Sequence, residues 1–290
     1  MNAPTPIFGI CAGQRSIGAI LIDAGRLKPE DAEQILRLQR DKGMRFGDAA
    51  RQLQLVSDAD IDFALSRQFD YPYLQRGESG VAEEVVAAYN PFLPQVEALR
   101  ALRSQLMLRW FDPEAGPRSL AITSPGRGEG RSWLVANLAV VFSQLGERTV
   151  IIDADLRNPR QHVLFGVNNQ MGLSAALSGR GGPNVVQRVS ALVDLSVLPA
   201  GALAPNPQEL IGRPAFTALL KELAREYDVI LIDTPAASSY ADVQTLAARA
   251  GGALLLARCH VTKAAVTRAL SKDLHQAGAN LVGTVLNEAR

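Results

Sequence analysis

One stretch of the sequence has the residue types that hold a phosphate group. It reads SPGRGEGRS from Ser124 to Ser132, after the apolar run 119–123 and before a helix-like segment, 134–145. Glycines let the backbone approach an anion and point its N–H groups at it, and a helix start adds partial positive charge. The stretch therefore predicts a phosphate-binding loop. Its candidate contacts are Gly126, Gly128, Glu129, Gly130, Arg131, Ser132 and Trp133.

Two positions depart from the usual P-loop pattern. That pattern places Lys before the Ser or Thr whose hydroxyl binds Mg²⁺, and this chain has Arg131 before Ser132. Arg keeps the charge but is a planar fork, whereas Lys is a compact point charge on a thin stem. Trp133 stands where a small residue or Thr is usual. We expect Arg131, with Trp133 beside it, to decide whether the chain catalyses or only binds.

Three carboxylates come after apolar runs further along the chain. Asp153 and Asp155 follow one such run, and Asp233 follows another. The carboxyl ends of parallel strands form the edge of a sheet at which ligands bind. Acids at that edge would repel a nucleotide triphosphate unless a cation such as Mg²⁺ intervened. The sequence therefore predicts a nucleotide site whose Mg²⁺ is held by Ser132 and a strand-end Asp.

Apolar runs with strand character alternate with helical segments from residue 119 onward. This alternation predicts an α/β protein of the P-loop type, with three α/β/α layers and a mostly parallel sheet. A small helical domain is expected before it. The expected strands cover residues 119–123, 148–157, 195–199, 227–235, 253–257 and 281–286.

Composition narrows the class of protein. The 290 residues are 47% hydrophobic and carry a net charge of +1, so no bulk attraction to a nucleic acid polymer is expected. No apolar run approaches the roughly 20 residues of a membrane helix. The two cysteines, Cys11 and Cys259, lie far apart and are expected to be free thiols. These features predict a cytoplasmic chain without a transmembrane segment of its own.

The first third of the chain repeats itself, with Gly18 and Gly47 standing 29 positions apart at matching points. Each copy predicts a short helix, a turn and a longer helix, which suggests duplicated units that bury a shared face. A polar, glycine-bearing stretch follows. We therefore predict a duplicated helical domain at 14–76, a linker at 77–94 and a second domain at 95–290.

The segment 95–106 carries two stripes at helical spacing. One stripe is apolar, and the other consists of Glu97, Arg100 and Arg103. Taken alone, the charged stripe is typical of a solvated helix face with pairing inside the helix.

The repeated segment resembles the N-terminal domain of type II secretion and pilus-extension ATPases. Some members of that family bind cyclic di-GMP through a tandem motif, which this chain matches in part at Gly18, Gln39, Arg45, Gly47 and Gln68. The resemblance allows cyclic di-GMP binding, with Arg45 on phosphate. A protein-docking module is the alternative.

Residues 95–287 resemble the catalytic domain of bacterial tyrosine kinases (BY-kinases), specifically the EpsG-like chain-length-determinant group. The stretch 124–132 matches their Walker A motif, 151–157 their Walker A′ motif and 230–235 their Walker B motif. The spacing Glu97-x-x-Arg100-x-x-Arg103 matches the motif through which such kinases pack into rings.

The resemblance implies phosphoryl transfer from Mg-ATP to tyrosine, with Arg131, Asp153 and Asp155 as catalytic residues. It also implies that Ser132, Asp155 and Asp233 hold the Mg²⁺. Asn287 falls where MinD/ParA relatives contact the adenine. The resemblance also implies a homo-oligomer, a role in exopolysaccharide chain length and export, and recruitment to the inner face of the membrane by a membrane chain-length-determinant protein in trans.

The family usually carries a C-terminal tyrosine cluster, whereas the last tyrosine of this chain is Tyr240. Tyrosine phosphorylation in this chain is therefore expected on one of its five tyrosines or on another protein. Two alternatives stay open beside the kinase. One is a catalytically weak, nucleotide-binding regulatory or scaffold subunit of the export machinery, and the other is a MinD/ParA-like ATPase.

Overall fold

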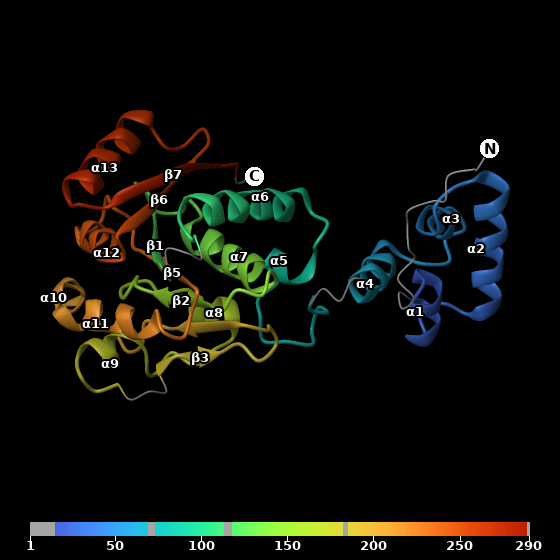
Figure 1. Ribbon diagram of the computed structural model, residues 1–290, viewed down its shortest axis with the longest axis horizontal. Helices are drawn as coiled ribbons and strands as arrows, with labels where there is room; N and C mark the ends of the chain where they lie inside the picture. The colour runs from blue at the N-terminus through green and yellow to red at the C-terminus, as the bar shows by residue number, and fades with distance from the viewer. Residues whose placement is uncertain (1–14, 69–72, 113–117, 182–184, 289–290) are drawn as a thin grey trace, which may run out of the picture. The chain divides into compact units, whose positions relative to one another are not determined.

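A computed structural model describes residues 15–68, 73–112, 118–181 and 185–288 (Figure 1). The chain divides into two compact units between Tyr73 and Leu74. Cys11 and Tyr71 lie outside the described residues. Among those that are described, no helix is long and apolar enough to cross a membrane.

The first unit contains two copies of a short helix followed by a longer one. Its helices are α1 (Ile17–Asp23), α2 (Pro29–Lys42), α3 (Phe46–Gln52) and α4 (Asp58–Gln68). The helix starts repeat at the same interval as the sequence. The turn after each short helix repeats too, because Gly25 and Gln54 both have positive φ, 68° and 55°.

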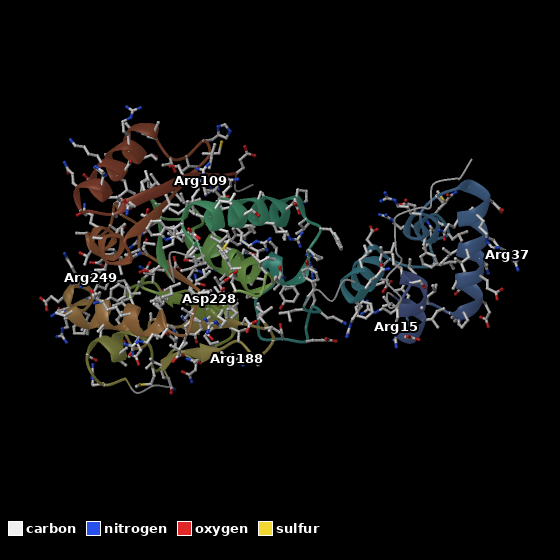
Figure 2. All side chains as sticks on the ribbon, viewed as in Figure 1. Arg15, Arg37, Arg109, Arg188, Asp228 and Arg249 are labelled. Carbon is white, nitrogen blue, oxygen red and sulfur yellow. The ribbon has the colours of Figure 1, made fainter. Side chains whose placement is uncertain are left out.

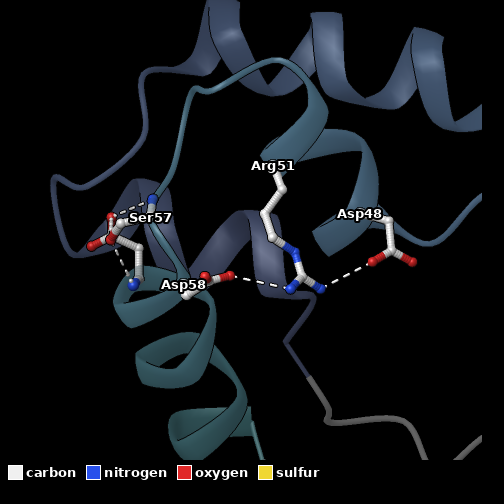
Figure 3. A network of polar contacts seen from close by, with 5 residues as sticks. Asp48, Arg51, Ser57 and Asp58 are labelled. Carbon is white, nitrogen blue, oxygen red and sulfur yellow. Dashed lines mark hydrogen bonds and ion pairs between the residues drawn. The ribbon is translucent and has the colours of Figure 1, made fainter.

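The two copies share one core. Helix α1 packs against α4 and α2 packs against α3, so each short helix contacts the long helix of the other copy. Leu21, Ile35 and Ala64 are fully buried between them. At the surface, Arg51 bridges Asp48 and Asp58, at 3.0 and 3.1 Å, and thereby ties α3 to the start of α4 (Figure 3).

The second unit is built on a seven-stranded sheet in the order β3-β4-β2-β5-β1-β6-β7. All neighbouring strands are parallel except β3, which is antiparallel to β4. The strands are β1 (Arg118–Thr123), β2 (Thr149–Asp153), β3 (Gln187–Arg188), β4 (Leu195–Leu198), β5 (Val229–Asp233), β6 (Gly252–Arg258) and β7 (Asn280–Asn287).

Helices cover both faces of this sheet (Figure 1). Alternate strand residues enter different cores: Leu120 and Ile122 belong to one cluster, and Ala121 belongs to the other. The three-layer α/β/α prediction is therefore confirmed. One face carries α5 (Val86–Tyr89), α6 (Pro94–Arg109), α7 (Arg131–Ser143) and α8 (Gln161–Phe165). The other carries α9 (Leu173–Leu177), α10 (Pro207–Gly212), α11 (Pro214–Leu223), α12 (Asp242–Ala250) and α13 (Ala264–Gln276).

The segment predicted as a linker packs onto the second unit. Val85 and Ala87 are fully buried in the core that covers α7. The backbone N–H of Ala87 donates to the Asn137 side chain at 2.9 Å, and the Leu74 N–H donates to the Ala88 carbonyl at 2.8 Å. The segment packs there because its apolar residues fill a layer beside the sheet. The polar composition of the preceding stretch, 75–80, gives no sign of this packing.

Candidate functional site

The phosphate loop joins β1 to α7 at the carboxyl edge of the sheet. Gly128 and Gly130 adopt left-handed backbone conformations, with φ of 70° and 98°. The φ of Gly130 favours glycine, and a Cβ there would also push the Asn287 side chain aside, because it would lie 2.5 Å from its amide nitrogen. The Glu129 carboxylate accepts the Gly126 N–H at 2.9 Å and braces the loop from within.

Arg131 does not extend from the loop but folds back into it. Its Nε donates to the Thr234 carbonyl at 2.9 Å, and its Nη1 donates to the Gly126 carbonyl at 2.7 Å and to the Ser124 hydroxyl. Only 9% of the residue is exposed. The guanidinium therefore cross-links the phosphate loop to the end of β5.

Negative charges around Arg131 offset part of the effect of its burial. Desolvation lowers the pKa of the guanidinium, while the carboxylates of Asp233, Asp155 and Glu129 raise it. Arginine stays protonated in proteins even when such shifts occur. The site consequently presents one buried positive charge, surrounded by the acids that the sequence predicted at this edge.

Asp153 and Asp233 end neighbouring strands and are paired in register. Both are completely buried. Burial raises the pKa of each carboxyl, and Asp233 raises the pKa of Asp153 further. Asp153 accepts two backbone N–H groups, from Arg160 and Gln161, both at 2.9 Å. Two like charges side by side in a buried place are costly without a cation between them.

The carboxylates fit a Mg²⁺ site in one specific respect. Oδ1 of Asp153 and Oδ1 of Asp233 are buried and have no hydrogen-bond partner. The Ser132 hydroxyl hydrogen-bonds to Asp233, which lowers the pKa of that carboxyl. Asp155 is 9% exposed and its Oδ1 accepts the Asn158 N–H at 2.9 Å. Oxygen ligands of these kinds are the ones that Mg²⁺ takes together with phosphate oxygens.

A cavity of about 630 Å³ lies beside the loop. Trp133 and Asn287 both line it, so the structure brings these two predicted residues together. The Asn287 side chain donates to the Glu129 carbonyl at 2.9 Å, and in this way the end of β7 is tied to the phosphate loop. The other lining residues are mainly apolar and come from α6, α7, β6 and β7.

The predicted ring motif lies on α6, away from the carboxylates. Glu97 and Arg100 pair at 3.2 Å within the helix, and the Glu97 side chain is 75% exposed. Arg103 instead donates to the Val141 carbonyl of α7 at 2.7 Å. The three residues therefore differ: Arg103 anchors α6 to its own domain, and Glu97 faces solvent.

Sequence reasoning missed Gln161. Its Nε2 donates to the Asp233 carboxylate at 2.7 Å and to the Ser132 carbonyl at 3.1 Å, so it links two of the three predicted metal ligands. Its backbone N–H also binds Asp153. No motif marks it, because it follows the DADLRNPR stretch as the first residue of a short helix.

A second set of residues was also missed. The Arg157 guanidinium lies 3.9 Å from the centre of the Tyr240 ring and pairs with the buried Asp242. Arg127 of the phosphate loop donates to the Tyr240 hydroxyl at 3.3 Å. The two arginines belong to motifs that were recognised, but the position of Tyr240 between them required the structure.

The phosphate loop, the strand-end acids and the parallel sheet define a P-loop nucleotide-binding domain of the ATPase type. The Pyrococcus furiosus cell division ATPase MinD has this fold, at TM-score 0.52 and 26% identity over 59% of this chain and 71% of that one. A family model for the cellulose biosynthesis protein BcsQ matches residues 118–282.

More similar proteins identify the family. The tyrosine-protein kinase YwqD of Bacillus subtilis is 32% identical over 209 residues, which are 72% of this chain and 87% of YwqD. The kinase domain of the Escherichia coli tyrosine kinase ETK superposes at TM-score 0.69 and 32% identity, covering 76% of this chain and 86% of that domain. The chain belongs to the bacterial tyrosine kinase family. It spans only 30% of the longer relative EpsB of Ralstonia solanacearum.

Proposed function

We propose that the chain transfers the γ-phosphoryl group of Mg-ATP to tyrosine hydroxyls. One observation carries the proposal: two buried, register-paired carboxylates, Asp153 and Asp233, face a phosphate loop that holds a buried arginine. Phosphoryl transfer needs little covalent chemistry from the protein and depends on positioning and charge. Membership of the tyrosine kinase family supports tyrosine as the acceptor.

Each residue has a distinct role in this proposal. The loop N–H groups and Arg131 hold the phosphates, and Asn287 and Trp133 contact the base. Ser132, Asp155 and Asp233 hold Mg²⁺, which neutralises the charge of the phosphates when bound. Asp153 orients the acceptor hydroxyl and takes its proton. Gln161 is a positioning residue, because it fixes the Asp233 carboxylate by a hydrogen bond.

We propose that this activity regulates the chain length and export of an exopolysaccharide. The match to a family named for cellulose biosynthesis supports a polysaccharide context. In this proposal a membrane chain-length-determinant protein is the partner in trans and recruits the chain to the inner face of the membrane. Glu97, Arg100 and Arg103 are the proposed contacts of a homo-oligomer.

A second candidate is a regulatory subunit with weak catalysis. The observation in its favour is that Arg131 donates three hydrogen bonds to groups of its own chain. Those donors must be released before they can bind phosphate, whereas the usual Lys reaches phosphate as a point charge. The regulatory reading therefore predicts slow turnover with ordinary folding.

Transfer of labelled phosphate distinguishes the two candidates. The wild-type chain is compared with Arg131→Lys and Asp153→Asn, using Asp228→Asn at the opposite end of β5 as the matched control. Label that disappears in Asp153→Asn but persists in the control supports the kinase. Label that appears only in Arg131→Lys supports the regulatory subunit. The kinase proposal is refuted if neither wild type nor Arg131→Lys transfers phosphate.

For the first unit we propose binding of a partner protein, with cyclic di-GMP as the alternative ligand. The nucleotide reading depends on Arg45, which caps the exposed start of α3 without a side-chain cap bond. Titration calorimetry with cyclic di-GMP decides between them. Absence of heat at high micromolar protein removes the nucleotide alternative.

A further inference from the structure

Tyr240 lies where the loop after β5 crosses the phosphate loop. The N–H groups of Ala237 and Ser238 donate to the carbonyls of Ser124 and Pro125, at 3.0 and 2.9 Å. These bonds hold the two loops together as one surface. Tyr240 stands at the end of this contact, half-buried, just before α12.

The Tyr240 side chain is placed by two arginines of the nucleotide site. Arg127, inside the phosphate loop, donates to its hydroxyl at 3.3 Å. Arg157, from the loop after Asp155, lies 3.9 Å from the centre of its ring. Arg157 is itself held by Asp242, whose side chain is 1% exposed. The phenol oxygen thus points to the loop that would hold the phosphates of ATP.

The other described tyrosines are placed differently. Tyr89 is 8% exposed, and its hydroxyl contacts Ser79 at 2.9 Å and the Val81 carbonyl. Tyr227 precedes β5, so it lies at the amino end of that strand, opposite the carboxyl edge. Tyr73 closes the first unit. Within the described residues, Tyr240 is the tyrosine in contact with the phosphate loop.

We propose that Tyr240 is an intramolecular phosphorylation site of this chain. The inference rests on the proposed kinase function and adds its acceptor. The phenol oxygen of Tyr240 forms a bond to the γ-phosphorus of ATP, and the bond from that phosphorus to the β,γ-bridging oxygen breaks. ADP leaves with the electron pair of that bond. The phenol proton is released to solvent water, which the half-buried Tyr240 side chain can reach.

The same arginines stabilise the product. A phosphotyrosine carries a charge of about −1.5 to −2 at neutral pH and three acceptor oxygens. Arg127 is already in contact with the oxygen that would carry the phosphate, and Arg157 is stacked on the ring. Arginine binds phosphate in a bidentate manner, so Arg127 offers a ligand to the modified residue. Phosphorylation would then lock the two loops together.

Phosphosite mapping of the full chain after incubation with Mg-ATP tests the inference. We expect phosphate on Tyr240 at a rate per molecule that does not depend on protein concentration. Tyr240→Phe should lose this incorporation, and Tyr227→Phe, the matched control, should keep it. Transfer by the wild type to a random glutamate–tyrosine polymer is measured in parallel.

The outcomes separate the inference from the proposed function. Transfer to the polymer with Tyr240 unmodified overturns the inference and leaves the kinase standing. A rate that rises in proportion to protein concentration also overturns it, because a second copy would then be the donor. Absence of transfer to both acceptors overturns the inference and the kinase together.

Discussion

Replacing Arg131 by Met removes every donor of the guanidinium while keeping an unbranched side chain. The carbonyls of Thr234 and Gly126 then lose charged partners at 2.9 and 2.7 Å. An unsatisfied buried acceptor costs about 1–3 kcal/mol. Removal of the positive charge also leaves Asp233 and Asp155 less compensated. The variant no longer has to bury a charged guanidinium, which offsets part of this cost. We therefore expect the free energy of unfolding to fall by about 3 kcal/mol.

Intrinsic fluorescence reports on this change without interference from the first unit. Both tryptophans of the chain, Trp110 and Trp133, belong to the second unit. With a urea dependence of about 2–3 kcal/mol per molar, a loss of about 3 kcal/mol lowers the unfolding midpoint by roughly 1 M. Arg131→Lys keeps the charge and some donors, so its midpoint should lie between those of Met and wild type.

Unfolding of Arg131→Met at the wild-type midpoint would refute the reasoning, because the three bonds would then add nothing to stability.

Mg-ATP extends the test. A ligand that binds only the folded chain stabilises it. Because Arg131→Lys gives up fewer internal bonds on binding phosphate, Mg-ATP should raise its midpoint more than it raises that of wild type. An equal or smaller rise would contradict the idea that the internal acceptors and the phosphate compete for the side chain at position 131.

Three further predictions concern stability. Gln54→Gly should stabilise the first unit by about 1 kcal/mol in thermal unfolding, because a φ of 55° is strained for a residue with a Cβ. No gain in stability would mean that contacts of the Gln54 side chain offset the backbone strain. Gly252→Ala should destabilise the second unit by about 1–3 kcal/mol, because its Cβ would lie 2.4 Å from the Trp110 ring. Unchanged tryptophan fluorescence and midpoint would count against this. Asp228, labelled in Figure 2, bonds to Arg148 at 2.6 Å, and this hydrogen bond lowers the pKa of the carboxyl. Asp228→Asn should therefore cost about 0.5–1 kcal/mol at pH 7, and urea midpoints of variant and wild type should converge as pH falls through the lowered pKa of the folded carboxyl, because the wild-type side chain is then protonated. A difference in urea midpoint that stays constant with pH would contradict a stabilising ion pair between Asp228 and Arg148.

The sheet and the phosphate loop follow from local sequence, because apolar runs that end in acids predict buried parallel strands. Asp153 and Asp233 meet at neighbouring strand ends, as sequence reasoning requires. The direction of the Arg131 side chain could not be predicted, since it depends on the Thr234 carbonyl, which lies 103 residues away in the chain. The same holds for Gln161, whose amide reaches Asp233 across the sheet edge.

The boundary between the two units differs from its prediction. The stretch 75–80 has the composition of a linker, but Val85 and Ala87 behind it are buried against α7. Composition describes each residue alone, whereas the packing of a short segment depends on whether a neighbouring layer leaves room for it. The chain after Asn206 forms two consecutive helices, α10 and α11, because Pro214 starts a new helix.

The bonds from Ala237 and Ser238 to the phosphate loop have a practical consequence. Because these two amide protons are donated to the carbonyls of Ser124 and Pro125, their exchange with deuterated solvent requires the loops to separate. Exchange at these two positions is therefore a label-free gauge of loop opening. It can be followed in the wild-type chain with no variant and no acceptor, before and after the addition of nucleotide.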